Sequence, residues 1–91
     1  MFELFYTRKA TEDINFFKKN SAKDFKKCKD LLDSICINPK VGIGHPKPLS
    51  YSEGIELWSR KVNKKDRMVY EIIEGDNLVV IHSIRSHYGD K

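Results

Sequence analysis

The chain has 91 residues, of which 40% are hydrophobic and 33% are charged, and its formal net charge is +4. This length accommodates one domain, and the balance of apolar and charged residues is that of a globular protein rather than a disordered one. No apolar run approaches the roughly 20 residues of a membrane-spanning helix, and the N-terminal residues lack the features of a secretory signal. We therefore expect a single cytoplasmic domain over residues 1–91 that does not contact a membrane.

The first part of the sequence predicts one strand followed by two helices. Residues 2–6, FELFY, are apolar and few, as in a buried strand. Thr7 stands before a rough apolar stripe of helical spacing, and Ser21 with Asp24 three residues later resembles a capping box. Apolar residues then recur every three or four positions until Asn38-Pro39 ends the second helix.

The second part predicts a loop followed by strands. Residues 39–54 contain all three prolines and three of the five glycines, and such long loops are often functional. Three strand-like runs follow at 55–62, 67–73 and 78–84, separated by short turns, which predicts an antiparallel meander. The order β-α-α-β-β-β favours an α+β domain with two helices packed on one face of a mostly antiparallel twisted sheet.

Cations in the last third of the chain are the first candidates for a functional site. The rigid fork of arginine suits phosphate, and Arg60, Arg67 and Arg85 all lie in this part of the sequence. A hairpin would bring Arg60 or Lys61 near Arg67, and pairing of the last two strands would bring residues 83–88 beside it. Converging arginines repel each other unless an anion lies between them. We therefore expect a phosphate site at this edge, to which Arg60, Lys61 and Arg85 contribute.

His87 and Tyr88 would lie at the same edge as Arg67. Each such residue alone has an ordinary explanation, because strand arginines often lay their stems over apolar neighbours and terminal aromatics often belong to the core. Their joint occurrence favours a phosphate-handling site. We expect His45 and His82 to have no catalytic part.

Four stretches form a combined signature: the loop GIGHPKPL, the strand ELWSRKV, the strand DRMVYEI and the C-terminal IHSIRSHY. Together they resemble the Txe/YoeB branch of the RelE/ParE toxin superfamily, whose loop reads Gly-x-Gly-x-Pro-x-Pro-Leu. The resemblance covers residues of about 35–88 well, and the helices in order and length only. It implies a RelE-like microbial RNase fold and the toxin of a bacterial type II toxin–antitoxin pair. Such a toxin is a ribosome-dependent endoribonuclease that cuts mRNA in the A site of the 70S ribosome, and a cognate acidic antitoxin blocks it.

The resemblance also implies roles for individual residues. By position, Arg67 matches the arginine that stabilises the transition state, His87 the general acid and Tyr88 the terminal tyrosine that orients the substrate. Arg60 falls on a basic strand position beside them. The tail of residues 89–91 extends past the point where close relatives often stop, which moves the terminal carboxylate away from Tyr88.

One position departs from the branch. Its catalytic glutamate lies between the two loop prolines, where this sequence has Lys47. Lys47 can act as the base only in its neutral form, which nearby arginines favour, and otherwise it is a second phosphate clamp. We expect the base role. The alternatives are that Glu53 or Glu56 substitutes, or that activity is weakened.

The mechanism that the resemblance implies uses no metal and no cofactor. A base takes the proton of the 2′-hydroxyl, His87 protonates the leaving 5′-oxygen, and arginines bind the non-bridging oxygens. The products are a 2′,3′-cyclic phosphate and a 5′-hydroxyl. Two other classes stay open, namely a ParE-like relative that acts by binding and a plain RNA-binding module. Homodimerisation also stays open.

Overall fold

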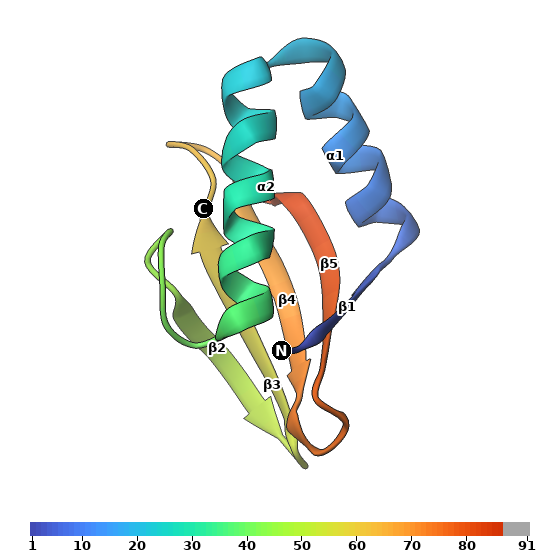
Figure 1. Ribbon diagram of the computed structural model, residues 1–91, viewed down its shortest axis with the longest axis vertical. Helices are drawn as coiled ribbons and strands as arrows, with labels where there is room; N and C mark the ends of the chain where they lie inside the picture. Colours follow the sequence, from blue (N-terminus) through green and yellow to red (C-terminus); the bar gives the residue numbers. More distant parts are fainter. Residues whose placement is uncertain (87–91) are drawn as a thin grey trace.

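Two helices cover one face of a five-stranded sheet in the computed structural model, which describes residues 1–86 (Figure 1). The elements are β1 (Glu3–Tyr6), α1 (Arg8–Asn20), α2 (Ala22–Ile37), β2 (Lys47–Ser52), β3 (Ile55–Lys61), β4 (Arg67–Ile73), the 3₁₀ turn η1 (Glu74–Asp76) and β5 (Leu78–Ser86). The strand order is β1-β5-β4-β3-β2, in which β1 runs parallel to β5 and the other pairs are antiparallel. The predicted α+β architecture is confirmed.

Two strand predictions need correction. The predicted loop of residues 39–54 contains β2, which pairs antiparallel with β3 at the edge of the sheet. Pro48 is tolerated there because an edge strand need not donate every backbone N–H. The first strand is not buried: β1 lies at the opposite edge, and the side chains of Phe5 and Tyr6 are 50% and 45% exposed.

Side-chain caps define both helices as the sequence predicts. The Thr7 hydroxyl accepts a hydrogen bond from the backbone N–H of Ala10 (3.1 Å) and donates one to the carbonyl of His82 (2.7 Å). The Ser21 hydroxyl accepts from the backbone N–H of Asp24 (3.2 Å), so Ser21 ends α1 and begins α2. The Thr7 cap therefore also ties the start of α1 to β5.

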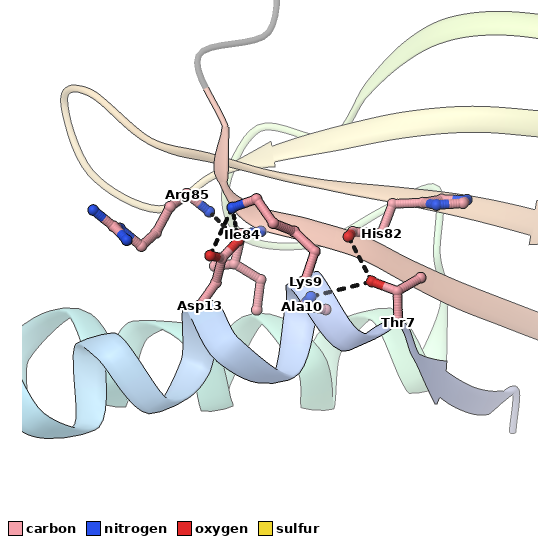
Figure 2. Close-up of polar contacts among 7 residues, drawn as sticks. All are labelled: Thr7, Lys9, Ala10, Asp13, His82, Ile84 and Arg85. Carbon is pink, nitrogen blue, oxygen red and sulfur yellow. Dashed lines mark hydrogen bonds and ion pairs between the residues drawn. The ribbon is translucent and has the colours of Figure 1, made fainter.

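Asp13 of α1 fastens the end of β5 to the helix layer (Figure 2). A bulge places Ile84 and Arg85 opposite the single residue Met68, and both backbone N–H groups donate to Asp13 Oδ2 at 2.8 and 2.9 Å. Burial raises the pKa of Asp13, but the hydrogen bonds from Arg85, Lys9 and Ile84 together lower it by more than burial raises it. The pKa of Asp13 is therefore below its ordinary value. The ionised carboxylate thus holds the last strand at a fixed position on α1.

Candidate functional site on the open face of the sheet

The strand register gathers polar side chains on the face that the helices leave uncovered, here called the open face. Lys47 of β2 pairs with Ser59 of β3, Lys61 of β3 pairs with Arg67 of β4, and Arg67 pairs with Ser86 of β5. Paired residues on neighbouring strands project from the same face, and residues two apart on one strand do so as well. These five residues from four strands therefore lie together near one end of the sheet.

Ser59 orients Arg67. Its side chain is fully buried, and its hydroxyl accepts a hydrogen bond of 2.9 Å from Arg67 Nε. Because Nε is fixed, the half-buried guanidinium of Arg67 is directed by the sheet rather than by solvent. Sequence reasoning missed Ser59, although strand alternation already placed it on the face of Lys61.

Lys47 and Lys61 are exposed on either side of this pair. From the spacing of sheets, the Cα atoms of Lys47 and Arg67, two strands and two positions apart, are separated by about 12 Å. Two long side chains can span that distance around a phosphate group. The structure thus brings the predicted residues Lys47, Lys61 and Arg67 together.

The two alternative base candidates lie elsewhere. Glu56 pairs with Ile72, five positions along β3 from Lys61, which is about 17 Å from the site. Its carboxylate is held by Lys40 Nζ at 3.0 Å and Trp58 Nε1 at 3.1 Å, and these hydrogen bonds, that of Lys40 first, lower the pKa of Glu56. Glu53 lies in the β2–β3 turn, still farther along the sheet. Of the three candidates, Lys47 lies nearest Arg67.

Arg60 does not belong to this site, and the prediction that it binds phosphate is wrong. Its side chain is 0% exposed and projects toward α2, where Nη1 donates to Ser34 Oγ at 2.7 Å. It shares this helix-covered face with Trp58 and Val62, as strand alternation requires. A group so enclosed cannot reach a substrate on the open face.

Arg85 also projects away from the open face. Its guanidinium carbon lies 3.5 Å from the ring centre of Phe16 on α1, and Figure 2 shows the side chain extending along the helix layer. It lines a cleft of about 1060 Å³ between the α1–α2 junction and the β3–β4 turn. Three aspartates and seven basic residues line this cleft; the basic ones are Lys23, Lys26, Lys27, Lys61, Lys64, Lys65 and Arg85. Arg85 therefore contributes to a basic cleft that Lys61 of the open face also lines.

The remaining predicted residues divide between described and undescribed parts. His82 contacts Glu71, with 2.6 Å between Nε2 and Oε1, and His45 lies in the loop before β2 with a φ of 53°. His87 and Tyr88 lie outside the described residues.

Within residues 1–86, no three side chains of His, Cys, Asp or Glu gather closely enough to hold a metal ion. None of the described helices is long and apolar enough to cross a membrane.

Residues 6–88 match the family model described as the YoeB-like toxin of bacterial type II toxin–antitoxin systems. The chain belongs to this family of toxins. Toxin YoeB from Synechocystis sp. is 35% identical over 83 residues, which cover 91% of this chain and 93% of that protein.

Solved structures of family members share the fold. The YoeB dimer from Staphylococcus aureus is 36% identical with a TM-score of 0.79, and the match covers 96% of this chain and 98% of that one. The heterotetrameric YoeB-YefM toxin–antitoxin complex from the same organism is 33% identical with a TM-score of 0.76, over 97% of this chain and 99% of that one. The resemblance drawn from the loop and strand motifs is thus confirmed at the level of family and fold.

Proposed function

We propose that this YoeB-like toxin is a ribosome-dependent endoribonuclease that cleaves mRNA in the A site of the 70S ribosome and so inhibits translation. The observation that supports this most is the arrangement of Lys47, Lys61 and Arg67 on the open face, with Arg67 oriented by Ser59. Three cations around one point of a sheet suit a phosphodiester, whose charge increases as the 2′-oxygen attacks phosphorus.

Arg67 and Lys61 bind the non-bridging oxygens in this mechanism. A donor that is held in place before the reaction stabilises the developing charge without first reorganising. Ser59 holds Arg67 in place in this way. Lys61 pairs directly with Arg67 and adds a second positive charge from the neighbouring strand.

Lys47 is the general base and His87 the general acid in this proposal. Lys47 takes the proton from the 2′-hydroxyl and must be neutral to do so. His87 protonates the leaving 5′-oxygen, because an imidazole can carry a proton near neutral pH, and Tyr88 orients the nucleotide. Both follow Ser86, the partner of Arg67, in the chain. The products are a 2′,3′-cyclic phosphate and a 5′-hydroxyl.

The partner of this toxin is proposed to be a cognate acidic antitoxin that covers the open face. The S. aureus relative is seen in a complex with YefM, and a second solved form of it is a dimer, so homodimerisation is proposed as well. An acidic segment would place a carboxylate near Arg67 and compete with RNA. A complex in which the antitoxin contacts only the helices, far from Arg67 and Lys61, would overturn this form of inhibition.

The test is cleavage of a translated mRNA by the purified toxin, with and without 70S ribosomes, mapped by primer extension. We expect cuts only when ribosomes are present, with a 2′,3′-cyclic phosphate on the upstream fragment. Equal cleavage of naked mRNA would show that the ribosome is not required. Binding to ribosomes without any cleavage would favour a relative that acts by binding, and binding to RNA alone would favour an RNA-binding module.

A further inference from the structure

Every N–H donor of the buried Arg60 has an acceptor. Nε donates to Tyr70 Oη at 3.0 Å, and Nη1 donates to Ser34 Oγ at 2.7 Å. The other three hydrogen bonds reach backbone carbonyls of the segment before β2: those of Ile43 (3.0 Å), Asn38 (2.8 Å) and Val41 (3.2 Å). An arginine has five such donors in a planar fork, so the side chain is saturated.

All five acceptors are neutral oxygens. Removing a guanidinium from water is costly, and an apolar side chain would suit a core position at lower cost. Arg60 instead provides five N–H donors in one rigid plane, which fix the positions of their acceptors. Three of these N–H donors bind the irregular backbone of residues 38–43, which belongs to no helix or strand.

The segment that Arg60 holds is pressed against α2. A Cβ atom added at Gly42 would lie 2.1 Å from Ser34 Oγ, and one added at Gly44 would lie 2.5 Å from Leu31 Cδ2. Both glycines also have positive φ values, 139° and 83°, which other residues rarely adopt. The backbone therefore has one close-packed path over the helix.

The main chain of β3 also binds this segment. The backbone N–H of Lys61 donates to the carbonyl of Gly44 at 2.7 Å, so the segment is bound by the side chain of Arg60 and by the main chain of the next residue. Only His45 and Pro46 separate Gly44 from Lys47, and the proline ring restricts its own φ. Lys47 then pairs with Ser59, the residue that orients Arg67.

We infer that Arg60 is a positioning residue for the proposed site: its fork sets the path of residues 38–44 and thereby places Lys47 opposite Ser59 and Arg67. Arg60 itself touches no RNA. Tyr70 extends the same network, because its hydroxyl donates to the carbonyl of Pro39 at 2.6 Å while it accepts from Arg60. The inference rests on the proposed function for its catalytic readout, but the hold on the segment can be measured without it.

The test compares Arg60→Lys with Ile72→Val, a core change on β4 that leaves the loop untouched. Lysine keeps the charge but not the planar guanidinium, so it cannot make the same set of hydrogen bonds to the carbonyls of residues 38–43. We expect Arg60→Lys to slow single-turnover cleavage on ribosomes by about 10- to 100-fold, as small misplacements do, with ribosome affinity unchanged within about threefold. Ile72→Val should cleave at the wild-type rate despite its lower stability.

Amide hydrogen exchange on the free toxin supplies the second readout. The Lys61 amide should exchange faster in Arg60→Lys than in Ile72→Val, because its acceptor at Gly44 is released. This arm also separates the two hypotheses: a wild-type toxin that does not cleave RNA defeats the proposed function, while faster exchange at Lys61 still supports the hold by Arg60.

Three results would overturn the inference: wild-type cleavage by Arg60→Lys, an equal loss of cleavage in Ile72→Val, or unchanged exchange at Lys61. If Arg60→Lys does not fold, Tyr70→Phe replaces it. That variant keeps the ring but removes the Nε acceptor and the donor to Pro39, and we expect it to slow cleavage several-fold with ribosome affinity kept. Wild-type cleavage and exchange in Tyr70→Phe would then reject the inference.

Discussion

Arg60 and Lys61 are neighbours on β3, yet they serve opposite faces of the sheet. Arg60 is fully buried and gives its donors to the loop before β2, whereas Lys61 is exposed and pairs with Arg67. A positive side chain therefore binds loop carbonyls on one face and is available to an anion on the other. Strand alternation, more than residue type, decides which of these two roles the side chain has. Changes on the open face should alter the cleavage rate directly, whereas changes on the helix-covered face should alter stability and affect the rate only through the position of the loop.

Removing Arg67 should give the largest effect of the open face. We expect Arg67→Ala to lower single-turnover cleavage by about 10²- to 10³-fold, because a fixed donor to the transition state is lost. The midpoint of thermal unfolding should change little. Arg8→Ala, which removes an exposed arginine of α1, is the matched control and should cleave normally. A large loss of stability in Arg67→Ala without a loss of rate would break the comparison between the faces.

Replacing His87 should have the next largest effect. We expect His87→Gln to lose about 10²-fold or more in single-turnover cleavage, the usual scale for a general acid. His82→Gln changes a histidine of β5 that contacts Glu71, and it should cleave at the wild-type rate. Equal losses in both variants would contradict the assignment of His87 as the general acid.

Lys47 can be tested by the pH dependence of cleavage. A lysine that acts as base must be neutral in the reactive state, so the rate should rise with pH, whereas a clamp stays charged. Arginine keeps the charge but does not deprotonate. We expect both Lys47→Arg and Lys47→Ala to lose activity and to abolish or shift the basic limb of the pH–rate profile. Wild-type rates and an unchanged limb in Lys47→Arg would exclude the base role of Lys47.

Asp13 tests the helix-covered side. Its folded-state pKa lies below the ordinary value, so its contribution to stability is present above about pH 4 and is lost as the pH falls through that lowered pKa. Urea unfolding should show Asp13→Asn less stable by about 1–3 kcal/mol at pH 7, with a flatter decline in acid. Asp76→Asn, an exposed carboxylate, should follow wild type. An acid profile of Asp13→Asn equal to that of wild type would contradict the assignment.

Ser59 should have the smallest effect. Ser59→Ala removes one hydrogen bond to Arg67, which corresponds to about a two- to tenfold loss in cleavage. If Ser59 acts only through Arg67, adding Ser59→Ala to Arg67→Ala should cost nothing more. Additive losses in the double variant would show that Ser59 contacts the substrate itself.

The helices and the three later strands were predictable because their signals are local. Thr7 and Ser21 cap the helices, and β-rich runs with short turns mark β3, β4 and β5. β2 was missed because two prolines lie in and beside it, which mark a loop unless the strand is known to be at an edge. The exposed position of β1 depends on its parallel pairing with β5, a long-range contact that no local pattern specifies.

The site was predictable in part. The hairpin register placed Lys61 beside Arg67, and the family motif pointed to Lys47. Arg60 was misassigned because the acceptors that make its burial tolerable are loop carbonyls. Their positions depend on the path of the loop, which the sequence does not specify.

The parallel pairing of β1 with β5 has a consequence for folding during synthesis of the chain. Residues 3–6 leave the ribosome early but find their partners only in residues 78–81, and Arg67 meets its partner only at Ser86. At about 5–20 residues per second, the N-terminal strand waits roughly 4–15 s with its edge unpaired. The sheet, including the pairing of Arg67 with Ser86, therefore cannot be completed until nearly the whole domain has been synthesised.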